Sequence, residues 1–213
     1  MKIGIIGSGV VGQQLGLGFV KLGHEVRIGT RDISKLANWK STAGENASAG
    51  SFTEVAKFSE MIVLASLWEG TQNAISLAGL ENFSEKIVID VTNPLDFSKG
   101  VPPKFVSAPG ESGGEKIQRM LPDSKVVKAF NTFSAYIMCN PAREEGDPSL
   151  FVAGNDEEAK KIVISFAENW GWKSVIDLGD ISKAFLLEAL AQLWIEYGFK
   201  YNNWAHAFKL LNK

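Results

Sequence analysis

Short apolar runs alternate with amphipathic segments along almost the whole chain. The runs at 2–6, 25–29, 61–66, 86–91, 125–130, 149–154 and 173–178 have the length and composition of β-strands. Between them, the segments at 10–22, 34–42, 69–79, 112–121 and 156–170 carry apolar residues at helical spacing. Strands that alternate with helices predict an α/β fold of the Rossmann type, with a doubly wound and mainly parallel sheet.

Capping signals sharpen two of the expected helices. "SFTE" at 51–54 and "SGGE" at 112–115 both have a serine followed three residues later by a glutamate, the spacing of a capping box. Asp32 or Ser34 is expected to cap the helix at 34–42. Each of these signals predicts that a helix begins at that point.

The C-terminal part is unusually aromatic. We predict helix over 181–212, with apolar residues on more than one face. The sequence therefore divides into a Rossmann domain at 1–178 and a helical extension at 179–213. The extension is expected to close the crevice of the first domain or to form a homodimer contact.

A glycine motif directly follows the first strand. "GIIGSGVVG" places Gly7, Gly9 and Gly12 in the spacing G-x-G-x-x-G, between a strand and a helix. In a dinucleotide-binding loop the three glycines allow a tight turn, a close backbone approach to pyrophosphate and close helix packing. The helix N-terminus would face the phosphates. The alternative is that the glycines serve only packing; the strand–loop–helix context favours a dinucleotide.

The end of the second strand indicates which dinucleotide binds. Arg31 lies 19 residues after Gly12, where NAD-binding proteins place a carboxylate for the ribose. Arginine instead offers a planar set of donors to a 2′-phosphate, and Thr30 adds a hydroxyl. The sequence therefore favours NADP(H). The alternative is a solvated Arg31 with Asp32 serving the ribose of NAD.

Composition excludes several classes of function. The 213 residues carry a formal charge of −2 with a mean hydropathy of zero, which gives no excess of basic residues for nucleic acid or an anionic membrane. No apolar run reaches the roughly 18 residues of a membrane-spanning helix. A single cysteine, Cys139, and two histidines predict no disulfide and no metal site. We expect a cytoplasmic protein.

Four segments together carry a family resemblance. "GIIGSGVVGQQLG", "GTRD", "DVTNP" and "VVKAFNT" resemble the NADP-dependent oxidoreductases related to the deazaflavin (coenzyme F420)-dependent NADP reductases. The cytosolic reductase domains of the STEAP metalloreductases are similar too. The resemblance covers nearly the whole chain and implies that NADP(H) lies along the carboxyl ends of the strands.

The resemblance also implies a set of cofactor-binding residues. Around the pyrophosphate these are Gly7, Ser8, Gly9, Val10, Val11 and Gly12, and at the 2′-phosphate they are Thr30 and Arg31. Ser66, Leu67 and Trp68 would flank the cofactor, and Thr92, Asn93 and Pro94 would lie near the nicotinamide. Asn131 and Thr132 would face the second substrate. No catalytic side chain is assigned.

Several of these residues have a simpler interpretation. Trp68 also fits a core aromatic, the Thr92–Pro94 segment also fits a turn, and Asn131 also fits a helix cap. The glycine-rich "APGESGG" at 108–114 fits a second phosphate loop, but a mobile loop and a helix start are favoured. His206 is expected to pack among aromatic residues. Lys128 falls within a predicted strand and is not assigned a catalytic role.

The expected activity follows from what the chain contains and what it lacks. It shows no catalytic triad, no paired acids in motif spacing and no catalytic histidine, which suits hydride transfer carried out by cofactors. By the resemblance, the acceptor is coenzyme F420, although Phe130-Asn131 is closer to the metalloreductases, which leaves FMN or FAD open. Two other functions remain: a dehydrogenase of a small carbonyl substrate, and a non-catalytic NADPH sensor.

Overall fold

The computed structural model describes residues 1–211 and contains one large sheet. Its eight strands run in the order β10-β9-β8-β5-β4-β1-β2-β3. All neighbouring strands are parallel except β8 and β9, which are antiparallel. The strands are β1 Lys2–Ile6, β2 Glu25–Gly29, β3 Ala47–Gly50, β4 Met61–Leu64, β5 Ile87–Asp90, β8 Lys125–Lys128, β9 Ser149–Gly154 and β10 Ser174–Asp177. The predicted Rossmann-type, mainly parallel sheet is confirmed.

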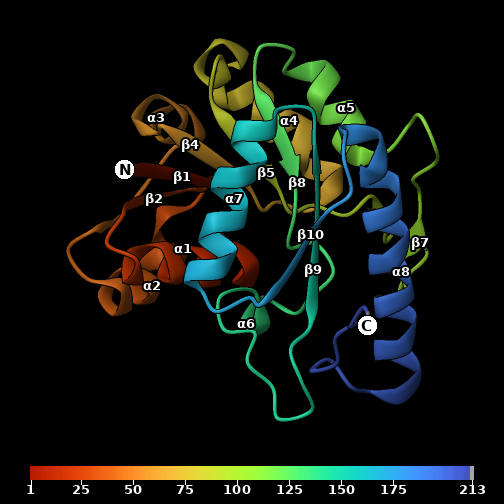
Figure 1. Ribbon diagram of the computed structural model, residues 1–213. Helices are drawn as coiled ribbons and strands as arrows, with labels where there is room; N and C mark the ends of the chain where they lie inside the picture. The colour runs from red at the N-terminus through yellow and green to blue at the C-terminus, as the bar shows by residue number, and fades with distance from the viewer. Residues whose placement is uncertain (212–213) are drawn as a thin grey trace.

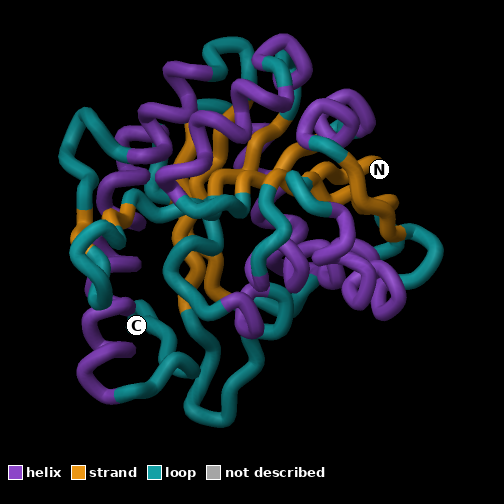
Figure 2. The backbone as a smooth tube through the Cα atoms, turned by 180° about the vertical axis from the view of Figure 1, so that it is seen from behind, coloured by secondary structure: helices purple, strands orange, loops and turns teal. Residues whose placement is uncertain are grey.

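Helices cover both faces of this sheet (Figures 1 and 2). One buried cluster joins the sheet to α1, α2, α6 and α7, and a second joins its other face to α3, α4, α5 and α8. The bounds are α1 Val10–Lys21, α2 Ala37–Ala43, α3 Phe52–Phe58, α4 Trp68–Ala78, α5 Gly113–Met120, α6 Ala135–Met138, α7 Glu157–Asn169 and α8 Ala184–Tyr201. Three 3-10 helices, η1 Ile33–Leu36, η2 Leu80–Phe83 and η3 Ile181–Lys183, complete the set.

The capping signals predicted the starts of these elements correctly. The Ser51 hydroxyl accepts from the backbone N–H of Glu54, and the Glu54 carboxylate accepts from the N–H of Ser51. Ser112 and Glu115 form the same capping box at the start of α5. Asp32 caps η1 by accepting from the Ser34 N–H at 3.1 Å, as one of the two predicted caps.

The predicted helix over 181–212 is wrong beyond Tyr201. The chain turns at Asn202, which has the left-handed φ of +48°, a conformation that asparagine tolerates well. It then runs back against β9, where the Phe208 carbonyl accepts from the Ser149 N–H at 2.9 Å. Aromatic contacts hold the return, since the Trp194 and His206 rings stack at 4.9 Å. Residues 212 and 213, the end of the predicted extension, lie outside the described residues.

Four short elements have weak sequence signals and were not predicted. The edge strand β3 is formed by small residues, "ASAG", which lack the β-branched and aromatic side chains that favour strands. The stretch at 92–111 contains an antiparallel pair, β6 Leu95–Asp96 and β7 Lys104–Phe105. The helix α6 has only four residues.

Candidate dinucleotide-binding site

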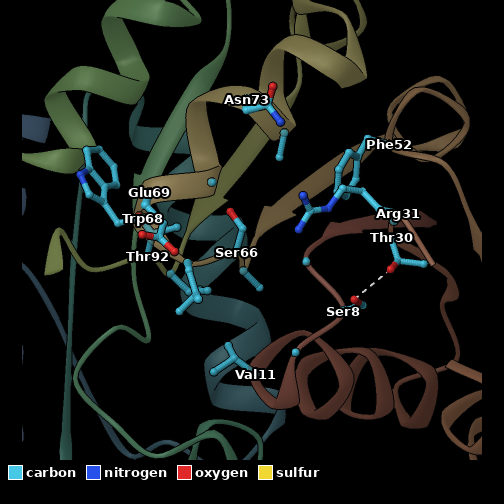
Figure 3. A pocket seen from close by; sticks show the side chains of 18 of the residues that line it. Ser8, Val11, Thr30, Arg31, Phe52, Ser66, Trp68, Glu69, Asn73 and Thr92 are labelled. Atoms are coloured by element: carbon cyan, nitrogen blue, oxygen red, sulfur yellow. Dashed lines mark hydrogen bonds between the residues drawn. The ribbon is translucent and has the colours of Figure 1, made fainter. Parts of the chain in front are cut away.

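A pocket of about 560 Å³ opens at the carboxyl ends of β1, β2, β4 and β5 (Figure 3). Such a volume lies within the range of small-molecule sites. Most of the predicted site residues line it. These are Gly7, Ser8, Gly9, Val10, Val11, Thr30, Arg31, Ser66, Leu67, Trp68, Thr92 and Asn93. Gly12, Pro94, Asn131 and Thr132 do not line it.

The three motif glycines differ in their surroundings. Gly7 has a φ of +132°, and a side chain there would meet the backbone of Ala65. A side chain at Gly12 would collide with the carbonyl oxygen of Gly7, so this glycine lets α1 pack tightly under the loop. Gly9 has no neighbouring atom within 4 Å of the position of a Cβ, and it faces the pocket. The loop is therefore tightly packed at Gly7 and Gly12 and open to the pocket at Gly9.

The open side of the loop is suited to an anion. Gly9 is the N-cap of α1, and no side chain caps that helix. The first backbone N–H groups of a helix have no partner within the helix, and the helix dipole adds partial positive charge there. A pyrophosphate therefore fits this position without displacing any side-chain cap.

One end of the pocket, next to β2, carries positive charge. Arg31 and Lys35 line it and Phe52 lies beside Arg31 in Figure 3. The Thr30 hydroxyl is already engaged, because it accepts from Ser8 Oγ at 3.0 Å and donates to the Asp32 carbonyl at 3.2 Å. Thr30 therefore ties the glycine loop to β2, and the two cations are the groups available to a phosphate.

The other end of the pocket lies after β4 and β5. Leu67 is exposed, Trp68 is partly buried against the second core cluster, and Glu69 follows in the first turn of α4. Thr92, only 3% exposed, forms part of the floor. The Thr92 hydroxyl and N–H both donate to Asp90 Oδ1, at 2.7 and 2.9 Å.

A buried ion cluster lies beneath Thr92. Lys128 Nζ is 2.9 Å from Asp90 Oδ2 and 3.0 Å from Glu188 Oε1, and it also donates to the Thr92 carbonyl at 2.5 Å. The side chains of all three ionic groups have no exposed surface or almost none. Burial alone would lower the pKa of Lys128, but the two carboxylates outweigh it and raise that pKa above its ordinary value. Lys128 is therefore held as a cation.

Glu188 also decides the role of the glycine-rich segment at 108–114. Its carboxylate accepts from the N–H groups of Gly113 and Gly114 at 3.1 Å each, and from the Ser107 hydroxyl. The N-terminus of α5 thus already holds an anion that belongs to the chain. The favoured helix start is confirmed, and this helix end has no room for a second phosphate.

Asn131 lies one layer behind the pocket. Its side-chain N–H donates to Asn93 Oδ1 at 2.9 Å and to the Leu187 carbonyl at 3.0 Å, while Asn93 Nδ2 donates to the Asn131 carbonyl at 2.8 Å. Phe130 before it has a φ of +61°, a strained conformation for a bulky residue. Asn131 therefore holds Asn93, which lines the pocket. Thr132 is buried, and Pro94 packs beside Gly113.

Nothing in the described part of the chain indicates a metal or a reactive thiol. Residues 1–211 contain no group of three or more His, Cys, Asp or Glu side chains arranged to hold a metal ion. Burial raises the pKa of the Cys139 thiol to about 12, which leaves it protonated at neutral pH. None of the helices in this range is long and apolar enough to cross a membrane.

Several lining residues were missed by the sequence reasoning. Those with polar, charged or aromatic side chains include Lys35, Phe52, Glu69, Asn73 and Phe97. Lys35 carried a usable signal, since it lies four residues after Arg31, near the start of the helix predicted over 34–42. Phe52 is the first residue of α3 and Glu69 lies in the first turn of α4. Residues at such positions commonly serve only the helix start, so the sequence did not mark them as site residues. Phe97 comes from the unpredicted hairpin.

The fold and this pocket define a Rossmann-type dinucleotide-binding protein whose pocket has a cationic end. Comparison with known proteins narrows the class. Residues 2–94 match the family model "NADP oxidoreductase coenzyme F420-dependent". The chain is 30% identical to the F420-dependent NADP reductase of Methanocaldococcus jannaschii, over 100% of this chain and 99% of that one. It belongs to the F420-dependent NADP reductase family and is an NADP-dependent oxidoreductase.

Two further relatives support this assignment. A crystal structure from Arthrobacter sp. FB24, provisionally assigned as an F420-dependent NADP reductase, superposes with a TM-score of 0.94 at 39% identity and covers 100% of both chains. The metalloreductase STEAP3 of Rattus norvegicus is 31% identical over 89% of this chain, but the match spans only 36% of that protein. The two resemblances expected from the sequence motifs are both confirmed.

Proposed function

We propose that this protein transfers hydride between NADP(H) and a flavin-type acceptor, with coenzyme F420 as the leading candidate. The observation that carries the proposal is one pocket that contains the open glycine loop and has two cations, Arg31 and Lys35, at one end. Arg31 makes no hydrogen bond or ion pair with any other residue from 1 to 211, so its donors are free for a 2′-phosphate.

Each part of the pocket has a binding role in this proposal. The N–H groups at the start of α1 bind the pyrophosphate, and Arg31 with Lys35 binds the 2′-phosphate. Thr92 and Asn93, both fixed from behind, position the nicotinamide. NADPH supplies the hydride when it is bound; the residues orient it and exclude water. This division of work explains how a pocket without an obvious acid–base pair can support the reaction.

The acceptor is proposed from family membership. The relative in M. jannaschii is named for coenzyme F420, whereas the rat relative is a metalloreductase. FMN or FAD therefore stays in the proposal as the second acceptor. Exposed apolar side chains beside the second end of the pocket, Leu67 and Phe97, offer a surface for a planar ring.

The test of activity is anaerobic oxidation of NADPH, followed by absorbance, with coenzyme F420 in one cuvette and FMN in another. Turnover with either acceptor supports the proposal and identifies the acceptor class. If NADPH binds but neither acceptor is reduced, the proposal is wrong. A small-carbonyl dehydrogenase or an NADPH sensor then takes its place.

The preference for NADP(H) is tested with Arg31→Ala. The loss of a charge-assisted interaction should weaken NADPH binding by about 1–3 kcal/mol and leave NADH binding nearly unchanged. Isothermal titration measures both affinities. Lys35→Ala should act in the same direction, since it removes the second cation. Equal losses for NADPH and NADH would contradict a role at the 2′-phosphate.

Assembly and location form a second part of the proposal. Four large apolar or aromatic side chains of α8 are exposed by 42 to 58%, which is typical of contact surfaces: Leu186, Leu193, Tyr197 and Tyr201. We propose that α8 forms a homodimer contact, which light scattering on the purified protein tests directly. A cytoplasmic setting fits the single cysteine, which is free.

A further inference from the structure

The two ends of the pocket differ in charge. Arg31 and Lys35 lie at the end next to β2, partly offset by Asp32, which caps η1. At the other end, Glu69 is the charged residue among those that line the pocket. Figure 3 shows Glu69 beside Trp68 and Thr92, away from Arg31. Under the proposed function, on which this inference rests, Glu69 therefore lies at the nicotinamide end.

Glu69 forms no capping box, unlike two other glutamates in the first turns of helices. Glu54 and Glu115 both close capping boxes at the starts of α3 and α5. The start of α4 has no side-chain cap, because its N-cap is Leu67. Within residues 1–211 the Glu69 carboxylate forms no ion pair and no hydrogen bond, so no side chain neutralises its charge and only the N-terminus of α4 offsets it.

The floor of the same end adds to the negative charge. Thr92 rests on the cluster of Asp90, Lys128 and Glu188, which holds two carboxylates and one ammonium group. The N–H groups at the start of α5 offset part of the excess. Negative charge therefore comes from two directions, from the rim at Glu69 and from beneath Thr92.

The nicotinamide ring changes its charge during the reaction, being positive in NADP⁺ and neutral in NADPH. We propose that Glu69 is a specificity-determining residue that makes the site bind NADP⁺ more tightly relative to NADPH. A carboxylate beside the ring stabilises the positive form by Coulomb attraction and leaves the neutral form almost unaffected. Tighter binding of the oxidised form makes bound NADPH a stronger hydride donor, which biases the enzyme toward reduction of its acceptor.

The exposure of Glu69 limits how strongly its charge changes the relative affinity for NADP⁺ and NADPH. Glu69 is on the rim, so solvent and salt screen its charge. We expect Glu69→Gln to raise the ratio of the NADP⁺ to the NADPH dissociation constant about threefold to tenfold at low ionic strength. A tenfold change in that ratio corresponds to about 30 mV in the potential of the bound couple. The effect should shrink as salt is added.

The experiment is isothermal titration of wild type and Glu69→Gln with NADP⁺ and NADPH, at low and high salt. Glu69→Asp keeps the charge and should keep the wild-type ratio. Glu168→Gln, on the exposed side of α7, removes one negative charge far from the pocket and should also leave the ratio unchanged. A glutamate that only supports the start of α4 would change thermal stability but not the ratio.

The outcomes separate this inference from the proposed function. A raised ratio in Glu69→Gln alone supports it. If both cofactors bind and the ratio in Glu69→Gln stays within twofold of wild type, the inference is wrong while the proposed function stands. If neither cofactor binds to wild type, the proposed function fails and the inference fails with it.

Discussion

Gly9 offers the sharpest test of the phosphate loop, because a side chain at this position should block the ligand without disturbing the fold. Apart from Gly9 itself and its two chain neighbours, no atom lies within 4 Å of the position that its Cβ would take. Its φ of −72° and ψ of 179° are accessible to any residue, including valine. We therefore predict that Gly9→Val folds normally and that its free energy of unfolding stays within about 1 kcal/mol of wild type.

Binding should respond very differently. The side chain would occupy the space above the N-terminus of α1, where the pyrophosphate approaches the backbone. Loss of two charge-assisted hydrogen bonds to phosphate, at about 1.5–3 kcal/mol each, gives a loss of about 3–6 kcal/mol. The affinity for NADPH and for NADH should both fall by about two to four orders of magnitude.

Isothermal titration measures the affinities, and urea unfolding measures the stability of the same samples. Gly12→Ala is the matched control, since its new methyl group would collide with the Gly7 carbonyl oxygen under the loop. That variant should lose stability by about 1–3 kcal/mol from overpacking. A folded Gly9→Val protein that binds NADPH within threefold of wild type would refute the assignment of this loop to the pyrophosphate.

Two further predictions concern the ion cluster. Lys128→Met leaves Asp90 and Glu188 buried without their cation, which should lower the free energy of unfolding by about 3–5 kcal/mol, measured by urea unfolding; a loss below about 1 kcal/mol would contradict the cluster. Because the folded protein raises the pKa of Lys128, its stabilisation is complete below the unfolded pKa of about 10.4 and is lost as pH rises through the folded value. Wild type should therefore lose stability above pH ~10.4 more steeply than Lys128→Met, and parallel pH curves would rule this out.

Local signals were enough to predict seven of the eight strands of the sheet and the glycine loop. The apolar runs, the two capping boxes and the Gly7–Gly12 spacing each depend on residues close together in the chain. Where these signals gave wrong or missing elements, the cause was also local. The small residues of β3 carry no strand signal, and the helical pattern after Tyr201 does not show that Asn202 reverses the chain.

Local sequence likewise identifies some residues of the candidate site, whereas others are identified only by the structure. Arg31 lies two residues after the strand predicted at 25–29 and 19 residues after Gly12, so a local spacing rule finds it. Glu69 sits in a helix start where an acidic residue is ordinary, and only the pocket shows that it faces the second end. Asn131 was expected to face a ligand, yet the structure places it behind Asn93 as a support. Whether Asn93 or Asn131 lines the pocket depends on how the segments after neighbouring strands pack, which local sequence does not show.

Lys128 shows most clearly why such information is absent from local sequence. A lysine in the middle of a predicted central strand contradicts the apolar pattern of that strand, and the contradiction is resolved only by Glu188, 60 residues later in α8, and by Asp90 in the neighbouring strand β5. The same Glu188 closes the N-terminus of α5. The C-terminal helix therefore supplies one of the charges beneath the pocket floor. Substitutions in α8 that move Glu188 should therefore shift the position of Thr92, because Lys128 contacts both residues.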